Sequence, residues 1–330
     1  MRYVDVGGRS ISVIGLGTWQ FGSREWRYGN DYANREAVAL TRRALDLGIN
    51  LIDTAEIYGL GRSERIVGTA IAERRDQVFL ATKLFPVLPL PPVVRQRGRA
   101  SARRLGVRSI DLYQLHAPNP VIPLSQAMRG FADLAADGLI RDVGVSNCSL
   151  AQWQEAESAL GGTVLSNQVR YSLATRAPEQ ATLPWAQAHD HLVIAYSPLA
   201  QGLLSGAYGP HNRPRDVRRQ NPLFLPDNLR RAGPLVDCVR EVAVRHGATP
   251  AQVALAWLVR RPNVVVIPGA RTVAQLEENV AAAELPLDAA DDRQLTEASD
   301  GFRPVGGKSA VRRARLQDAA SSVRRRAGRW

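Results

Sequence analysis

The sequence predicts an α/β fold, a (β/α)8 TIM-type barrel with an N-terminal β-hairpin and a C-terminal helical tail. Strand and helix patterns alternate along the chain, and eight strand patterns occur from Val13 onward. Most of these strands are continuous apolar runs, as expected for parallel strands that are covered on both faces. The main alternative is a doubly wound sheet, but residues 17–22, after the first strand, lack its G-x-G-x-x-G spacing.

The individual elements are predicted from turn residues, caps and helix terminators. A hairpin is expected where two short alternating segments flank Gly7-Gly8, a pair that suits a tight turn. Asn34 and Ser63 should cap the first two helices, and Ser149 and Thr249 should cap two later ones. The hairpin is expected at 2–13, the strands at 13–18, 49–53, 78–83, 110–116, 142–146, 164–168, 192–197 and 264–267, and the helices at 34–47, 63–74, 92–105, 124–136, 150–160, 178–189, 228–246, 250–260 and 272–282, with a last helix from 286.

Length and charge indicate one barrel with a short basic tail. The chain has 330 residues, 45% of them hydrophobic, and no stretch reads as a linker between domains. Residues 303–330 carry nine basic residues against one acid, which accounts for eight of the twelve net positive charges. We therefore expect a single barrel domain at 1–302 and a tail at 303–330 that packs on the barrel or extends from it. The tail is interpreted as a solvated amphipathic helix, so neither nucleic acid nor membrane is expected as a partner.

The cysteines and the first residues favour a cytoplasmic protein. Cys148 and Cys238 are the only cysteines, which is no disulfide framework and fits a reducing compartment. The first residues lack the apolar core of a signal peptide, and no apolar run approaches the length that spans a membrane. The oligomeric state is left open between a monomer and a weak oligomer.

Polar residues at the ends of the predicted strands should surround one pocket, because the strand C-termini form the active face of such a barrel. The second, third and fourth strands contribute Asp53 with nearby Tyr58, Lys83 and His116. Lys83 has the strongest single signal, because the chain contains only two lysines against 41 arginines. Each of the other three could instead be an ordinary turn, packing or core residue when it is considered alone.

Taken together, these four residues suit protonation of an oxygen on which negative charge develops. The ammonium of Lys83 should lower the pKa of Tyr58, and Asp53 should keep that ammonium charged and oriented. His116 can donate a hydrogen bond to a carbonyl oxygen or direct it toward Tyr58. A metal site is not expected, since His189-Asp190-His191 lies before a strand, at the opposite face, and none of the common metal motifs occurs.

The chain resembles the aldo-keto reductases, and within them a bacterial, actinobacterial-like branch. The matching segments occur in order over nearly all of residues 1–300, and they are Gly15-Leu16-Gly17-Thr18, Asp53 to Gly59, Thr82-Lys83, Leu115-His116, Gly144 to Asn147, Asn167-Gln168-Val169, Ser197 to Leu204, Ile267 to Ala270 and Gln275 to Asn279. The resemblance implies a barrel that binds a nicotinamide cofactor across its C-terminal face. It also implies Tyr58 as proton donor, Lys83 and Asp53 as the residues that tune it, and His116 as the residue that orients the substrate.

The same resemblance implies a set of cofactor-binding residues. The set includes Gly17, Thr18, Trp19 and Asp53. The nicotinamide carboxamide would be held by Ser146, Asn147 and Gln168, and the nicotinamide ring would stack on Tyr196. The pyrophosphate would be lined by Ser197, Leu199, Gln201 and Leu203, the 2′-phosphoribose would be held by Gly269, Ala270 and Arg271, and the adenine would lie near Gln275, Glu278 and Asn279. An arginine before a helix N-terminus suits a dianionic phosphate, which favours NADPH over NADH. Candidate substrate-pocket residues are Trp19, Trp26, Tyr28, Phe85, Asn119 and Arg170, whose aromatic bias suggests an uncharged or partly apolar compound.

Three hypotheses of function follow. The first is an NADPH-dependent reductase of aldehydes or ketones. The second, from another class, is a cofactor-bound regulatory module without turnover, against which the lack of a long N-terminal extension argues. The third is a polyol or alcohol dehydrogenase, which uses the same site in the reverse direction.

Overall fold

A closed sheet of eight parallel strands forms the centre of the protein. The computed structural model describes residues 1–22, 32–214, 216–314 and 316, and within these the eight strands pair in chain order. A parallel bridge between Ile14 and Val266 joins the first and last edges, so the sheet closes into the predicted barrel. The strands are β3 (Leu16–Gly17), β4 (Leu51–Asp53), β5 (Phe79–Leu84), β6 (Ile110–Leu115), β7 (Ile140–Ser146), β8 (Val164–Arg170), β9 (Leu192–Tyr196) and β10 (Val264–Val266).

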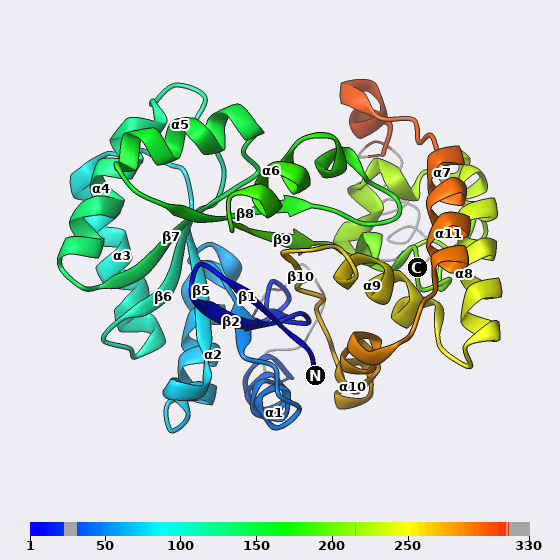
Figure 1. Ribbon diagram of the computed structural model, residues 1–330, viewed down its shortest axis with the longest axis horizontal. Helices are drawn as coiled ribbons and strands as arrows, with labels where there is room; N and C mark the ends of the chain where they lie inside the picture. The colour runs from blue at the N-terminus through cyan, green and yellow to red at the C-terminus, as the bar shows by residue number, and fades with distance from the viewer. Residues whose placement is uncertain (23–31, 215, 315, 317–330) are drawn as a thin grey trace, which may run out of the picture.

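Helices surround the barrel (Figure 1). The outward side chains of the strands are buried against these helices. Helices α8 and α11 pack side by side at one edge of this ring. The α-helices are α1 (Tyr32–Asp46), α2 (Arg62–Ile71), α3 (Pro91–Leu105), α4 (Leu124–Ala136), α5 (Leu150–Leu160), α6 (Thr182–Ala188), α7 (Pro226–Arg231), α8 (Gly233–Arg245), α9 (Pro250–Val259), α10 (Val273–Ala281) and α11 (Ala289–Gly301). Short 3-10 helices are η2 (Tyr58–Gly61), η3 (Arg75–Gln77), η4 (Ala177–Gln180), η5 (Ala200–Gly202), η6 (Val217–Gln220), η7 (Pro222–Phe224) and η8 (Ala282–Glu284).

The N-terminal hairpin closes the end of the barrel at which the strands begin. Its strands, β1 (Tyr3–Val6) and β2 (Arg9–Ser12), pair antiparallel and turn at the predicted glycines. Val6 and Ile11 are buried in one cluster with residues from the first positions of the barrel strands, such as Leu51 and Phe79. Figure 1 shows the hairpin lying across the middle of the ring of helices. The opposite end, where the strands finish, is thereby the only open end of the described barrel.

Two of the four predicted helix caps are wrong. Helix α1 already begins at Tyr32, and the Oδ1 of Asn34 instead accepts a hydrogen bond from Arg62. Helix α2 begins after Gly61, whose left-handed backbone (φ 82°) occupies the cap position. Ser63 lies inside the helix, because its buried hydroxyl contacts the hydroxyls of Thr18 and Thr54 at 2.9 Å each.

The other two predicted caps are confirmed. Ser149 and Thr249 each form a capping box with the glutamine three residues later. Two long predicted helices are divided in the structure. The segment 178–189 is η4 followed by α6, and 228–246 is α7 followed by α8.

The chain continues beyond α11 as a segment that returns to the barrel. Phe302 is buried in the main core, and residues 307–314 are helical. Ala310 and Ala314 pack against Leu225, a residue that precedes α7. Within the described ranges, every helix is too short or too polar to cross a membrane.

Candidate active site

A buried ion pair forms the floor of the open end of the barrel. Asp53 ends β4 and Lys83 lies on the neighbouring β5, with their side chains 2% and 0% exposed. The Nζ of Lys83 is 2.6 Å from the Oδ1 of Asp53, and it also donates to the carbonyl oxygen of Thr54. Burial lowers the pKa of Lys83, but Asp53 and Tyr58 outweigh this effect, so the pKa is raised overall. The amine is therefore charged at neutral pH.

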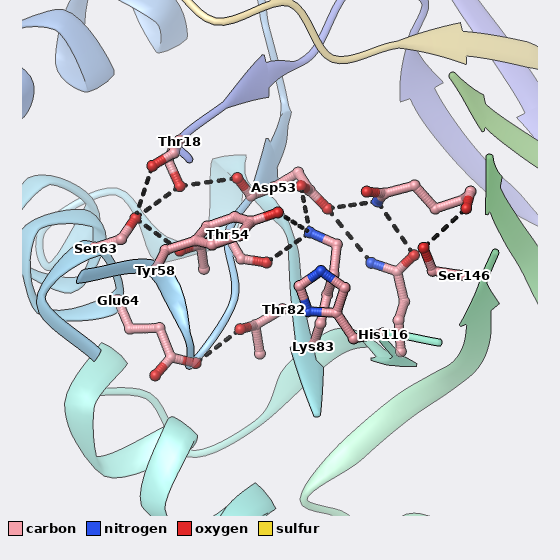
Figure 2. A network of polar contacts seen from close by, with 12 residues as sticks. Thr18, Asp53, Thr54, Tyr58, Ser63, Glu64, Thr82, Lys83, His116 and Ser146 are labelled. Carbon is pink, nitrogen blue, oxygen red and sulfur yellow. Dashed lines mark hydrogen bonds and ion pairs between the residues drawn. The ribbon is translucent and has the colours of Figure 1, made fainter. Parts of the chain in front are cut away.

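Tyr58 extends its hydroxyl over this ion pair (Figure 2). It follows β4 in the short helix η2, and the Nζ of Lys83 lies 3.5 Å from its hydroxyl oxygen. Burial raises the pKa of Tyr58, and the charge of Lys83 offsets this only in part. Lys83 acts in the predicted direction, but the net shift of the Tyr58 pKa is upward, because desolvation disfavours the phenolate more than the ammonium favours it. Tyr58 is a neutral phenol that can donate its proton.

His116 stands beside the phenol as a neutral imidazole. It directly follows β6, and its ring meets those of Tyr58 and Phe85 edge-on, with 5.9 Å between centroids in each case. Burial and the nearby charge of Lys83 lower its pKa to about 3. Its Nδ1 is buried without a hydrogen-bond partner in the described structure, while the ring itself lines a cleft at the open end of the barrel.

Two glutamine amides hold the other oxygen of Asp53. The Nε2 of Gln168, on β8, donates to Oδ2 at 2.8 Å, and the Nε2 of Gln114, on β6, donates at 3.4 Å. Ser146, at the end of β7, donates to the carbonyl oxygen of Gln168. Gln114 was not predicted, although it lies two residues before His116 and therefore on the same face of β6.

Asn147 and Tyr196 extend this polar set toward the opening. The Nδ2 of Asn147 donates to the carbonyl oxygen of His116, and its Oδ1 accepts from the hydroxyl of Tyr196 at 2.8 Å. Asn147 has a φ of 57°, a left-handed conformation that asparagine tolerates better than most residues. Residues on or directly after six successive strands, β4 to β9, thus meet at one end of the barrel.

One end of a cleft of about 700 Å³ is lined by Tyr58, His116, Asn147 and Tyr196. Most predicted cofactor residues line the same cleft, namely Gly17, Thr18, Trp19, Asp53, Ser146, Asn147, Gln168, Tyr196, Ser197, Leu199, Gln201, Gly269, Arg271, Gln275, Glu278 and Asn279. Leu203 and Ala270 do not line it. Both are 1% exposed and pack in the hydrophobic core, so the structure gives their side chains no access to a ligand there.

The far end of the cleft is built on the start of α10. Thr272 caps this helix by accepting from the backbone N–H of Gln275. The side chain of Gln275 accepts in turn from the backbone N–H of Arg271, and both residues line the cleft. Glu278 accepts from the hydroxyl of Thr249 at 2.6 Å, which joins α10 to α9. A helix N-terminus with an adjacent arginine favours a bound anion.

One long wall of the cleft comes from the segment after β9, and its arginine was not predicted. Arg218, in η6, lies over the ring of Tyr208 and forms an ion pair with Asp216 at 2.6 Å. It also donates to the carbonyl oxygen of Gln201, whose φ of 57° departs from the usual range. No motif identified Arg218, because it lies in a long irregular loop where position cannot be inferred from strand or helix periodicity.

Three of the predicted substrate-pocket residues, Trp19, Phe85 and Arg170, line the cleft. The prediction for Asn119 is wrong. Its side chain donates to the carbonyl oxygen of Pro86 and accepts from the N–H groups of Val121 and Ile122, so it shapes the loop after β6. Trp26 and Tyr28 lie outside the described residues.

A family model described as the aldo/keto reductase family matches residues 13–300. The chain belongs to the aldo-keto reductase family. An uncharacterised oxidoreductase of Mycobacterium tuberculosis is 55% identical over 306 residues, which cover 92% of this chain and 95% of that protein. This aldo-keto reductase is accordingly an oxidoreductase.

Solved structures of other aldo-keto reductases share the fold. An enzyme from Klebsiella pneumoniae in complex with NADP and acetate is 32% identical, with a TM-score of 0.72 over 93% of this chain and 97% of that one. The glycerol dehydrogenase AKR11B4 from Gluconobacter oxydans is 30% identical, with a TM-score of 0.82 over the same shares of the two chains. The TIM-type barrel of this aldo-keto reductase is thus common to its structural relatives.

Behind the ion pair, a partly buried glutamate and a completely buried one support the site of this aldo-keto reductase. Glu56 accepts from the backbone N–H of Phe85 at 2.6 Å and pairs with Arg97. Glu64, in α2, accepts from the hydroxyl of Thr82 at 2.7 Å and from Arg104 at 2.5 Å. Neither glutamate was predicted: Glu56 lies in the loop between β4 and η2, and an acid in the first turn of a helix, such as Glu64, is usually interpreted as a solvated surface residue.

The histidine pair before β9 is a structural feature. His191 contacts the carboxylate of Glu157 at 2.7 Å, and Trp185 stacks on His189. Across the described ranges, no group of three or more histidine, cysteine or acidic residues is arranged to hold a metal ion.

Proposed function

We propose that this aldo-keto reductase reduces an aldehyde or ketone to an alcohol, with NADPH as the hydride source and Tyr58 as the proton donor. The observation that carries the proposal is a neutral phenol within 3.5 Å of a charged, buried Lys83. That phenol faces a cleft long enough to extend from the ion pair to the start of α10.

The residues of the cleft fit NADPH at both ends. Amide and hydroxyl groups of Ser146, Asn147 and Gln168 match the carboxamide of a nicotinamide. Arg271 and the N-terminus of α10 match a phosphate monoester, and Arg218 adds positive charge to the wall between the two ends. Tyr196 offers an aromatic face at the nicotinamide end. When bound there, the nicotinamide would supply a hydride to the carbonyl carbon.

The protein residues would then complete the reduction by moving one proton. His116, a neutral donor, would orient the carbonyl oxygen toward the hydroxyl of Tyr58. Tyr58 would give its proton to that oxygen as negative charge develops there. Lys83 would stabilise the resulting phenolate, and Asp53 would keep Lys83 in place.

Replacement of the proton donor gives the first prediction. Tyr58→Phe should lower kcat for carbonyl reduction by about 10²- to 10⁴-fold, which is the usual contribution of a positioned general acid. NADPH consumption would be measured with a panel of aldehydes, keto-sugars and diketones, and NADPH binding should persist.

Tyr113→Phe is the matched control for this experiment. Tyr113 is a buried tyrosine of β6 whose hydroxyl lacks a hydrogen-bond partner in the described structure, so the change removes one oxygen away from the cleft. Unchanged turnover in Tyr58→Phe would assign the proton to another group. NADPH binding by the wild type without turnover on any carbonyl would instead favour a regulatory module.

Replacement at the far end of the cleft gives the second prediction. Arg271→Ala should raise the KM for NADPH by about 10- to 100-fold, because a hydrogen bond to a charged group is lost. The KM for NADH should stay the same, since NADH lacks the phosphate. Arg103→Ala changes an exposed arginine of α3 outside this cleft and should affect neither constant. An equal change with NADH and NADPH would contradict the phosphate assignment.

The reverse reaction uses the same residues. Alcohol oxidation would require Tyr58 as the base, and a structural relative is named as a glycerol dehydrogenase. We propose reduction as the main direction, in which the neutral phenol of Tyr58 starts the cycle as the proton donor. A cytoplasmic location stays a prediction, consistent with two free, buried cysteines.

A further inference from the structure

Asn228 joins the C-terminal segment to the loop that precedes α7. Its side chain is completely buried and forms three hydrogen bonds to backbone groups. The Oδ1 accepts from the N–H of Val305 at 2.7 Å, and the Nδ2 donates to the carbonyl oxygens of Val305 and Pro222. One amide therefore holds together two segments that lie 77 residues apart in the chain.

The remainder of the C-terminal segment packs on the same place. Ala310 and Ala314 are buried against Leu225, at the start of α7. Arg313 pairs with Asp227 at 2.6 Å. Residues 302–314 thus contact the stretch 222–228 through hydrogen bonds between the Asn228 side chain and the backbone of Val305, through apolar packing and through an ion pair.

The stretch 222–228 leads directly to the wall of the cleft. Asn221 precedes it and donates to the Oε1 of Gln201 at 2.9 Å. Arg218, one turn earlier, donates to the carbonyl oxygen of the same Gln201. Gln201 and Arg218 both line the cleft, and Gln201 has a left-handed backbone that its neighbours must maintain.

We propose that residues 302–314 act as a brace that positions the wall segment 216–225 and thereby slows the release of the cofactor. Asn228 is the positioning residue of this brace. The wall has only short 3-10 helices of its own, so packing from outside must supply much of its order. This inference rests on the proposed function in one respect, that NADPH occupies the cleft beside Gln201 and Arg218.

Two variants of the full chain distinguish an effect on the brace from a general loss of stability. Asn228→Ala removes the three hydrogen bonds, while Ala310→Asp places a charge against Leu225 and leaves Asn228 intact. Ala135→Asp, at an exposed position of α4, is the matched control for the second variant. If Asn228→Ala does not fold, Ala310→Asp still tests the proposal.

Hydrogen exchange and cofactor release are the two measurements. Amide exchange of residues 216–225, measured without cofactor, should become faster in both variants and stay unchanged in the control. NADPH dissociation, followed by fluorescence after dilution, should become about fivefold faster or more, with little change in the association rate. The pre-steady-state rate of carbonyl reduction should stay near that of the wild type.

The possible failures are distinguishable. Unchanged exchange of 216–225 in a folded Ala310→Asp protein would overturn the brace. Faster exchange with an unchanged NADPH dissociation rate would overturn its role in cofactor release. A wild-type protein that does not bind NADPH would overturn the proposed function, whereas the exchange measurement would still decide whether the brace exists.

Discussion

At the residue scale, the chemistry of the site depends on how burial and charge balance around Tyr58. Lys83 and Asp53 are almost completely buried and lie 2.6 Å apart, and Asp53 helps to raise the pKa of Lys83, which keeps the amine charged. Tyr58 lies close enough to Lys83 for its phenolate to be stabilised once a proton has left. Until then burial keeps the phenol protonated. At neutral pH the phenol of Tyr58 therefore keeps its proton, and the ammonium of Lys83 can stabilise the phenolate that remains after the proton is transferred.

The protonation states of Tyr58 and His116 give the third prediction, a flat pH profile. Tyr58 must be protonated to act, and because its pKa is raised above 10, the acid form persists throughout the neutral range. His116, with a pKa of about 3, is neutral over the same range. The kcat for reduction, at saturating NADPH, should therefore vary little from about pH 5 to about pH 9 and fall only at higher pH. A fall centred between about pH 6 and about pH 7 would indicate instead that an ionising histidine controls the rate.

The four central residues could be predicted from sequence because strand ends in a barrel converge. Asp53, Lys83 and His116 each close a recognisable apolar strand, so their meeting follows from topology. The net pKa of Tyr58 could not be predicted, since it depends on how completely the ring is buried. Arg218 was missed because the conformation of a long loop is not encoded in local periodicity.

At the element scale, one buried carboxylate links two helices to the strand that carries Lys83. Glu64 of α2 is completely buried and accepts from Thr82 of β5 and from Arg104 of α3. The two helices cross closely at Gly68, where a Cβ atom would lie 2.4 Å from the carbonyl oxygen of Leu105. Thr82 is thereby fixed from behind, which also fixes the backbone next to Lys83.

Removal of this carboxylate gives the fourth prediction. Glu64→Ala should lower the free energy of unfolding by about 3 kcal/mol, because it leaves the buried hydroxyl of Thr82 without its partner and removes from Arg104 its nearest carboxylate. This value is at the lower end for a buried pair, since the side chain of Arg104 is 21% exposed. Urea denaturation with Asp137→Asn as control measures the effect. Asp137 pairs with Arg99 on the surface, and its loss should cost less than about 1 kcal/mol.

The double variant Glu64→Leu with Arg104→Leu sharpens that experiment. It replaces the pair by apolar side chains and should recover part of the lost stability, although the hydroxyl of Thr82 stays unpaired. A Glu64→Ala protein as stable as the Asp137→Asn control would show that the buried pair contributes nothing net.

Helix boundaries were predictable where the cap uses only neighbouring residues. Ser149 and Thr249 were found because each capping box is contained within four residues. Ser63 is also a residue type that favours caps, but Ile66 stands where a capping box needs Glu or Gln, and the hydroxyl of Ser63 bonds to Thr18 and Thr54 from other elements. Tertiary contacts of this kind override local preference and cannot be read from the sequence around them.

At the scale of the whole molecule, the barrel has one closed and one open end. The hairpin fills the end where the strands start, so among the described residues the cleft is the route by which ligands reach the ion pair. The order of strands and helices was predictable from the alternation of patterns, and the structure confirms it. The contact between the C-terminal segment and α7 was not predictable, because it is made by two small alanines and one buried asparagine, which have no distinctive sequence pattern. The division into a barrel at 1–302 and a tail at 303–330 stays a prediction.

The scarcity of lysine has a practical consequence. Lys83 is inaccessible, and the only other lysine, Lys308, is exposed within the helical residues 307–314. The N-terminal amine is also engaged, with Glu284 at 3.2 Å. An amine-reactive fluorophore should therefore attach mainly at Lys308, on the segment that packs against α7. Such a label would report on the docking of that segment while the enzyme turns over, without any substitution in the chain.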